Sequence, residues 1–453
     1  MSTFSHRTPG FYKRLWKLSL PVILQNLITF SLGLIDTFMV SQLGNQEMAA
    51  VTTANVPVFL LISIVFGVQS GLGILVSQYW GKGDTERIRR LIALTMRVVL
   101  CASTLFALAG FFFAEPLMQI FSSEEPVIAA SAEYLKTLSL SFVLFSVSNC
   151  YLMCLRAVEQ VKVSMAVYSC SFFINVFFNY CFIFGKLGFP AFGIRGAAMG
   201  TVIARGFELC AVLVYMAFIE KKVRFTPRCI LLGSGGLGSD YLRNSLPIVG
   251  NELLWGLGMS MINMTIGRMG QTFVAAASIA NVMNQLCSVF TFGIANAAAV
   301  LCGKTIGSGQ GRQEAQRVAN SLLVVGEILS ILAGCVLLLL RTPVLAIYNV
   351  TPETASTAYT LLTILGCMEP IMGFSCVAIV GVLRGGGDVN TNFVLDCGLL
   401  WVQAVPLGLL AAFVLHWSAP MVFFLMRSDN IVKAIICLPR ILSGRWIRNV
   451  TRE

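Results

Sequence analysis

Long apolar runs separated by short polar breaks dominate the hydrophobic pattern of this chain. Twelve runs reach the length of about 20 residues that an α-helix needs to cross the hydrocarbon core of a bilayer. They are continuously apolar rather than alternating, so they predict spanning helices and not the strands of a membrane barrel. The expected spans are residues 15–40, 49–78, 91–113, 133–155, 163–185, 196–219, 243–267, 273–301, 317–340, 355–383, 392–414 and 419–438.

An internal repeat relates the two halves of the chain. When the sequence is shifted by 226 residues, 19 of 83 positions are identical between residues 17–99 and 243–325. The tripeptide at Ser19–Pro21, for example, returns at Ser245–Pro247. Because each half holds an even number of spans, both halves start on the same side of the membrane, and the repeat axis runs along the membrane normal.

These patterns predict an all-α polytopic membrane protein with twelve transmembrane helices in two six-helix lobes. The repeat places the N-lobe at residues 1–219 and the C-lobe, with a short basic cytoplasmic tail, at residues 243–453. Residues 220–242 form the expected cytoplasmic linker between the lobes. Substrate sites in such proteins lie within or between the lobes near the middle of the membrane.

Composition and charge agree with a membrane protein and orient it. The chain is 57% hydrophobic and 12% charged, whereas a soluble domain carries about 25% charged residues. The net charge of +11 would indicate nucleic acid on a soluble protein. Here 24 of the 32 Lys and Arg residues fall on one side of the membrane and four on the other. The positive-inside rule therefore predicts cytoplasmic N- and C-termini in a multi-pass protein of the bacterial cytoplasmic membrane.

Motifs for catalysis and nucleotide binding are missing from the sequence. The two histidines, His6 and His416, fall in a tail and an outer loop, and neither an HExxH nor a GxSxG motif is present. Gly233, Gly235 and Gly238 match GxGxxG, but they lie in the linker and not in a βαβ unit. We therefore expect no enzyme activity, no metal centre, and neither nucleotide nor nucleic acid as a partner.

Five motifs, in their order along the chain, carry a family resemblance. SLP opens each half, GLIDTFMVSQLG spans residues 33–44, and QYWGKGD spans residues 78–84. LRAVEQ follows at residues 155–160, and NVFFNYCFIFGKLGFPAFGIRGAA covers residues 175–198. Over residues 15–440 the chain thus resembles bacterial members of the multidrug and toxic compound extrusion (MATE) family.

The resemblance implies a function that composition alone does not give. Members of this family export amphipathic, often cationic organic compounds in antiport with Na⁺ or H⁺. For this chain it implies alternating access between two lobes, with the coupling ion as the sole cofactor. It also implies small organic substrates and the lipid bilayer as partners of a monomer. Fixed charges within the spans then become the first candidates for the site.

The leading candidate is Asp36, because a charge in hydrocarbon costs about 2.5–3.5 kcal/mol and is rarely kept without a role. Asn26, Thr29, Gly33 and Asp36 follow a 3-4-3 spacing, which places them on one helix face. Asp36 also matches the first-span aspartate that the resemblance links to cation coupling. We therefore predict that Asp36 is the main coupling residue and that Asn26 and Thr29 belong to the substrate pocket.

Four further residues complete the predicted coupling set. Glu252 lies in the seventh span and ranks second, with Na⁺ expected at Asp36 or at Glu252. Asn175 and Asn179 form an i,i+4 pair in the fifth span; where one branch of the family has an aspartate, Asn179 cannot titrate. The two amides could still hydrogen-bond to Asp36 or supply oxygen ligands for Na⁺. Asp396 in the eleventh span is the last member.

The remaining polar residues of the spans divide into pocket candidates and structural candidates. The pocket candidates are Asn55, Trp255, Met259, Asn281 and Gln285, in spans that the repeat relates to spans one and two. Three weaker carboxylates are Glu208, expected to pair with Arg205, Glu369, expected at a helix break before Pro370, and Glu327.

One alternative function stays open at this point. Distant relatives in the same superfamily export or flip lipid-linked or polysaccharide cargo and tend to have a basic central cavity. Arg97, Arg205 and Arg427 lie within predicted spans, so the sequence does not exclude this reading.

Overall fold

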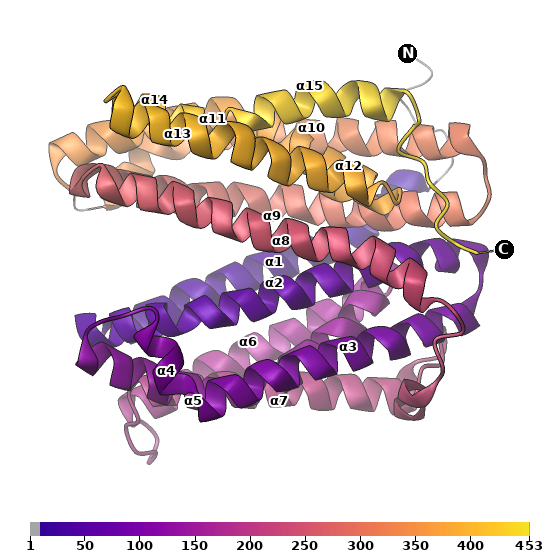
Figure 1. The fold of residues 1–453 in the computed structure, drawn as a ribbon, viewed down its shortest axis with the longest axis horizontal. Coiled ribbons are helices and arrows are strands. Elements are labelled where there is room, and N and C mark those ends of the chain that lie inside the picture. Colours follow the sequence, from indigo (N-terminus) through magenta and orange to yellow (C-terminus); the bar gives the residue numbers. More distant parts are fainter. Residues whose placement is uncertain (1–9, 349, 453) are drawn as a thin grey trace. The chain divides into compact units, whose positions relative to one another are not determined.

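The computed structural model describes residues 10–348 and 350–452, and these residues are largely helical (Figure 1). They contain no β-strand, which confirms the predicted all-α class. Ten of the described helices are long and apolar enough to cross a membrane. The α-helices are α1 (Phe11–Ser41), α2 (Asn45–Lys82), α3 (Thr85–Phe112), α4 (Ala114–Gln119), α5 (Glu125–Ala157), α6 (Val161–Phe184), α7 (Ile194–Val214), α8 (Gly238–Arg268), α9 (Gln271–Gly307), α10 (Arg312–Ile347), α11 (Pro352–Cys376), α12 (Val389–Phe393), α13 (Val405–Leu409), α14 (Ala419–Leu425) and α15 (Asp429–Leu442).

Several helices continue into π-helical turns. The π-helical segments are Tyr215–Ile219, Val377–Leu383, Val394–Gly398, Leu400–Ala404 and Leu410–Val414, and a 3₁₀ turn covers Pro227–Leu231. Most of them fall in the eleventh predicted span, which therefore departs furthest from a regular α-helix. Such π-turns are rare and often occur at functional sites, and Asp396 lies in one of them.

Each predicted span is helical in the structure. Two of them, α8 and the stretch 419–438, fall outside the ten candidates chosen by length and hydropathy. The stretch 419–438 is not one continuous helix, because a turn separates α14 from α15. In this turn the Ser428 hydroxyl donates to the carbonyl of Leu425 at 2.8 Å. Buried charges at the start of α15, described below, explain why the chain does not continue as a plain apolar helix.

The chain divides into two compact units. The N-unit contains Leu24–Tyr79 and Asp84–Val249, and the C-unit contains Met1–Ile23, Trp80–Gly83 and Gly250–Glu453. Because α1, α2 and α8 contribute residues to both units, these limits differ from the repeat boundaries. The predicted lobe and linker limits stay a prediction.

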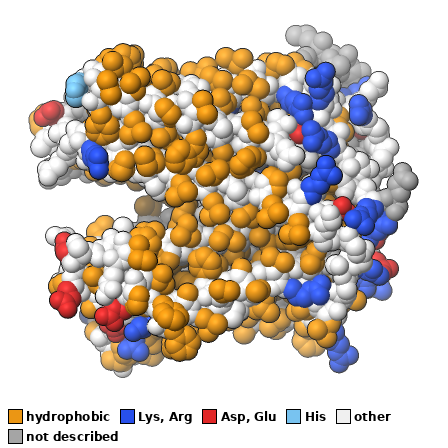
Figure 2. Space-filling view, in the orientation of Figure 1, with side chains coloured by type: hydrophobic (Ala, Val, Ile, Leu, Met, Phe, Trp, Pro, Cys, Tyr) orange, Lys and Arg blue, Asp and Glu red, His pale blue; other side chains and the backbone are white. Residues whose placement is uncertain are grey.

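Within each unit the helices pack side by side. In the N-unit α5 packs against α3, α6 and α7, and in the C-unit α9, α10 and α11 pack against one another (Figure 1). The N-unit core includes Leu61, Leu91 and Leu135, and the C-unit core includes Leu361 and Leu365. In each unit, hydrophobic side chains cover the middle of the visible face, and most visible Lys and Arg side chains gather at one end (Figure 2). This is the distribution expected of a membrane-spanning protein.

The segment that follows each six-span half places one aromatic side chain inside its own unit. In the N-unit, Phe225 is fully buried and its ring lies 6.0 Å from that of Tyr151. In the C-unit, Trp446 is fully buried and donates to Gln316 at 3.1 Å. The two segments occupy corresponding places after the sixth and twelfth predicted spans, so the repeat extends to the ends of both halves.

Candidate functional site

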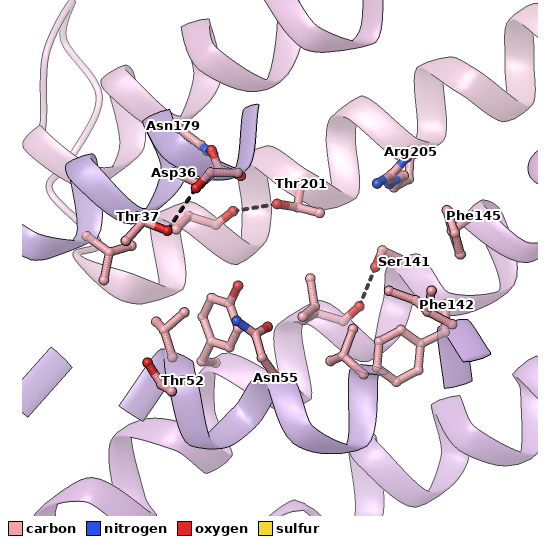
Figure 3. A pocket seen from close by; sticks show the side chains of 18 of the residues that line it. Asp36, Thr37, Thr52, Asn55, Ser141, Phe142, Phe145, Asn179, Thr201 and Arg205 are labelled. Atoms are coloured by element: carbon pink, nitrogen blue, oxygen red, sulfur yellow. Dashed lines mark hydrogen bonds between the residues drawn. The ribbon is translucent and has the colours of Figure 1, made fainter. Parts of the chain in front are cut away.

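A cavity of about 330 Å³ lies among α1, α2, α5, α6 and α7 of the N-unit (Figure 3). This volume falls within the range of about 300–1,000 Å³ that is usual for small-molecule sites. Its wall combines polar and apolar groups, including Asp36, Asn55, Asn179, Thr201, Arg205, Phe142 and Phe145. A cavity of this kind can hold an amphipathic molecule, with a few polar groups available to orient it.

Asp36 is partly exposed and lines this cavity from α1. Its Oδ1 accepts a hydrogen bond of 2.8 Å from Nδ2 of Asn179 on α6. Among the described residues, no Lys or Arg lies within ion-pair distance of the Asp36 carboxylate. The carboxylate is therefore held by an amide and keeps its negative charge uncompensated by a salt bridge.

A chain of side-chain hydrogen bonds runs from Asp36 across α6 to α7. Asn179 also donates to Oδ1 of Asn175 at 2.8 Å. Asn175 donates in turn to the hydroxyl of Thr201 at 3.3 Å, and Thr201 donates to the carbonyl of Ala197 at 3.1 Å. The sequence prediction that the two asparagines share a face with Asp36 agrees with this geometry; their role in coupling stays a prediction.

The carbonyl oxygen of Asn179 occupies an unusual position. Asn179 is buried, and its Oδ1 has no hydrogen-bond partner among the described residues. A Cβ atom at position 200 would lie 2.0 Å from this oxygen, so only glycine at this point of α7 leaves room for it. A buried oxygen without a donor costs about 1–3 kcal/mol, and a bound cation or proton donor would remove that cost.

Arg205 lies one helical turn beyond Thr201 on α7 and also lines the cavity. Its Nη1 donates to both carboxylate oxygens of Glu208, at 2.8 and 2.9 Å. Ser171 donates to the same carboxylate at 2.6 Å. The predicted ion pair of Glu208 is confirmed, and the reason is that Glu208 is buried and its charge needs a partner.

The C-unit carboxylates are arranged differently, because both have a basic partner. Asp396 accepts from Lys433 at 2.9 Å and from Asn251 at 3.0 Å, and Lys433 also pairs with Asp429 at 2.8 Å. Glu252 lies 3.2 Å from the guanidinium of Arg384. Arg384 and Lys433 are themselves buried, so these pairs compensate charges within the helix packing.

Two weaker carboxylates of the C-unit have no printed polar partner at the atoms concerned. Glu369 is buried and forms no hydrogen bond or ion pair with a described residue. The expectation that it marks a helix break is wrong, because α11 continues through Pro370 to Cys376. Glu327 on α10 has a buried Oε2 without a hydrogen-bond partner among the described residues.

The predicted pocket residues are scattered over both units. Asn55 lines the N-unit cavity, whereas Asn26 and Thr29 lie earlier on α1 and are not among its lining residues. In the C-unit, Asn281 accepts from Arg427 at 3.2 Å. Trp255 and Gln285 are exposed, and Met259 packs against the hydrophobic core.

Comparison with known proteins identifies the family. The sequence profile of the MatE family matches residues 21–181 and 247–410, which is more than half of the chain. The chain belongs to the MatE family. The profile match falls in both halves, in agreement with the internal repeat.

Individual MatE relatives match nearly the whole chain. A protein of Thermotoga maritima, named a probable multidrug resistance protein NorM, is 24% identical and covers 98% of this chain and 96% of its own. The solved structure of the Vibrio cholerae MATE transporter VcmN has a TM-score of 0.87 at 18% identity, covering 97% of this chain and 98% of its own. A MOP superfamily transporter from Pyrococcus furiosus has a TM-score of 0.85 at 19% identity, covering 96% and 95%.

Membership of the MatE family settles the class of the protein. It is a multi-pass membrane transporter with a two-lobe helical architecture, and it is not an enzyme. The related proteins named above are described as multidrug resistance or MATE proteins. The candidate site of this MatE protein is therefore a place for transported molecules and ions rather than for bond chemistry.

Several residues of the two sites were not singled out in the sequence. Thr201 and Gly200 are ordinary residues for an apolar span, and no pattern marks them. Lys433 and Arg384 are basic residues at or near spans, where a charge usually has a partner. That signal was available for both, but it does not say which acid is the partner.

Proposed function

We propose that this MatE protein is a secondary active antiporter. In this proposal it exports amphipathic, often cationic organic compounds and couples their export to the entry of Na⁺ or H⁺ by alternating access. The N-unit cavity is the proposed place for the substrate, and Asp36 is the proposed main coupling carboxylate. Asn175 and Asn179 assist Asp36, and Na⁺ or H⁺ is the sole cofactor.

The state of Asp36 is the observation that carries the proposal. Its carboxylate lines a cavity of drug-sized volume and is held by one amide hydrogen bond. A carboxylate without a salt bridge can exchange a cation or a proton without first breaking an ion pair. Its charge also attracts the amino group of a cationic substrate, so the ion and the substrate compete for one group.

Competition of this kind gives antiport. An ion that binds two conformations equally well shifts neither of them, whereas an ion that prefers one conformation moves the population toward it. If the coupling ion and the substrate exclude one another at Asp36, the gradient of the ion drives release of the substrate. The cavity then reloads after the ion has left on the other side of the membrane.

The oxygen atoms around Asp36 suit a hard cation. Na⁺, like Ca²⁺ and Mg²⁺, prefers oxygen ligands, and Asp36, Asn175, Asn179 and Thr201 all present oxygens in one hydrogen-bonded chain. The Asn179 carbonyl oxygen without a partner is a ready ligand. The same carboxylate can accept a proton, so Na⁺ and H⁺ are both retained as coupling ions.

The alternative, an exporter of lipid-linked or polysaccharide cargo, would be favoured by a basic cavity. The N-unit cavity instead contains one aspartate and one arginine among its charged lining residues. This balance favours small organic molecules. The proposed setting is the bacterial cytoplasmic membrane, with a monomer whose N- and C-termini are cytoplasmic, as the charge bias of the sequence predicts.

Transport in proteoliposomes tests the proposal. The purified protein would be reconstituted, loaded with a fluorescent cationic dye, and subjected to an imposed Na⁺ or H⁺ gradient. We expect dye movement against its gradient with one ion and collapse of that movement when the ion gradient is dissipated. Dye movement that is indifferent to both gradients would overturn antiport, and total absence of dye movement would favour a dedicated cargo.

A further inference from the structure

The second charged residue of the N-unit cavity, Arg205, has no place in the coupling scheme described above. It lines the same cavity as Asp36, and Figure 3 shows the two side chains at different parts of the wall. An arginine in the wall repels purely cationic molecules. Its presence in a cavity proposed for cations therefore needs a reason.

The surroundings of Arg205 hold it in place from the side away from the cavity. Glu208 binds only Nη1, and the Glu208 side chain is 1% exposed while that of Arg205 is 25% exposed. The guanidinium also lies 4.7 Å from the ring centroid of Phe145, which lines the cavity. These contacts orient the arginine and leave its accessible part toward the open space.

Part of the guanidinium is available for a ligand. Arginine has five N–H donors, and the Nε–H and Nη2–H groups of Arg205 have no hydrogen-bond partner among the described residues. A carboxylate is the ligand group that matches such paired donors in geometry and charge. A lysine would present a point charge without this fork.

The corresponding arginine of the C-unit is occupied. Arg427, which the repeat pairs with Arg205, donates from Nη2 to Asn281 at 3.2 Å. Its guanidinium carbon lies 3.7 Å from the ring centroid of Phe423. The repeat thus keeps an arginine above an aromatic ring in both halves, but in the N-unit the Nη2 group is left for another partner.

We propose that Arg205 is a specificity-determining residue, and that it makes the N-unit cavity favour substrates with an acidic group and a basic group over substrates with a basic group alone. The basic group is directed toward Asp36 and the acidic group toward Arg205. A cavity of about 330 Å³ is large enough for one small molecule to reach both. The inference rests on the proposed function, because it assumes that the cavity holds the exported molecule.

Binding of a matched pair of dyes tests this inference. The probes are a rhodamine that carries a free carboxylic acid together with its basic nitrogens, and the ethyl ester of the same rhodamine. Fluorescence titration of the purified wild-type protein should give a lower Kd for the acid. A charge-assisted hydrogen bond is worth about 1.5–3 kcal/mol, so with solvent screening we expect a preference of about tenfold.

The decisive variant removes the arginine without leaving a buried charge behind. In Arg205→Gln combined with Glu208→Gln, both charges of the pair disappear, and we expect the acid and the ester to bind with equal Kd. Arg205→Lys keeps the charge and should retain part of the preference. The matched control on α7 is Arg195→Gln, because Arg195 forms an exposed pair with Glu133 at 3.6 Å and should leave the ratio unchanged.

Two outcomes would overturn the inference: equal binding of acid and ester by the wild type, or a preference that survives in the double variant. A circular dichroism spectrum and a gel-filtration profile like those of the wild type would establish that the variants are folded. Because the measurement is of binding, it is independent of the gradients. A dye preference that depends on Arg205 without gradient-driven export would support the inference and reject antiport.

Discussion

The Asp36 site of the N-unit and the Asp396 site of the C-unit treat a buried carboxylate in opposite ways. Asp36 is held by the amide of Asn179 at 2.8 Å, and among the described residues no basic side chain is close enough to pair with it. Asp396 lies 2.9 Å from Lys433, which also pairs with Asp429. The first arrangement leaves a charge that can be exchanged, whereas the second neutralises charge inside the packing.

The comparison shows that duplication preserved the helices but not the chemistry. The repeat aligns Asp36 with Ile262, which is buried in the hydrophobic core of the C-unit. It aligns Asn26 with Glu252, whose charge is balanced by Arg384 at 3.2 Å. One half therefore has the features of an ion-exchanging site, and the other has the features of a charge-balanced support. Four variants test this difference.

The largest effect is expected from Asp36→Asn. The amide is nearly the same size as the carboxylate but neither takes up a proton nor offers a negative charge to Na⁺. We therefore expect gradient-driven transport in proteoliposomes to fall more than about 100-fold, because an ion that no longer distinguishes two states shifts neither. The thermal unfolding midpoint should stay within a few degrees of the wild type. Transport at the wild-type rate would move the coupling site to the C-unit.

The next largest effect concerns stability and belongs to Lys433→Met. This change leaves Asp396 and Asp429 buried without their shared partner, and breaking a buried pair costs about 3–5 kcal/mol. We expect a clearly lower thermal unfolding midpoint in detergent. Lys17→Met, at an exposed lysine of the same unit, is the control and should unfold like the wild type. If the two variants are equally stable, the Lys433 network does not support the C-unit fold.

A smaller effect on ion affinity is expected from Gly200→Ala. The new Cβ would lie 2.0 Å from the Asn179 carbonyl oxygen, so the asparagine must move away from α7. We expect the concentration of coupling ion needed for half-maximal transport to rise about tenfold, in the range of one lost charge-assisted contact. Gly206→Ala on the same helix meets no atom within 4 Å and should leave that concentration unchanged. A matching change in both variants would mean that helix α7, and not Asn179, is responsible.

The smallest effect is expected from Glu252→Gln. Glutamine keeps an oxygen that can accept from Arg384, so the contact at 3.2 Å survives while its charge is lost. We expect transport to change less than about threefold, since a hydrogen bond to a charged group retains much of its strength. Initial rates in the same proteoliposomes would measure it. An effect as large as that of Asp36→Asn would erase the distinction between the two sites.

The helical spans were predictable because the hydrocarbon core imposes a length and a composition on each of them. The apolar runs of the sequence correspond to helices such as α2, α5 and α9, and the family profile falls on both halves of the repeat. The irregular parts were not predictable. The π-turns around Asp396 and the turn before Asp429 depend on buried ion pairs between helices, and hydropathy carries no information about those.

The sequence by itself determined the class of the protein, its repeat and the face of α1 that contains Asp36. Tertiary structure alone decided which polar residues meet. Asn179 reaches Asp36 across 143 positions, and Asn251 reaches Asp396 across 145. The physical reason is that helices apolar on most sides have no strong polar face to fix their rotation in lipid. Only their packing against one another turns one carboxylate toward a cavity and another toward a lysine.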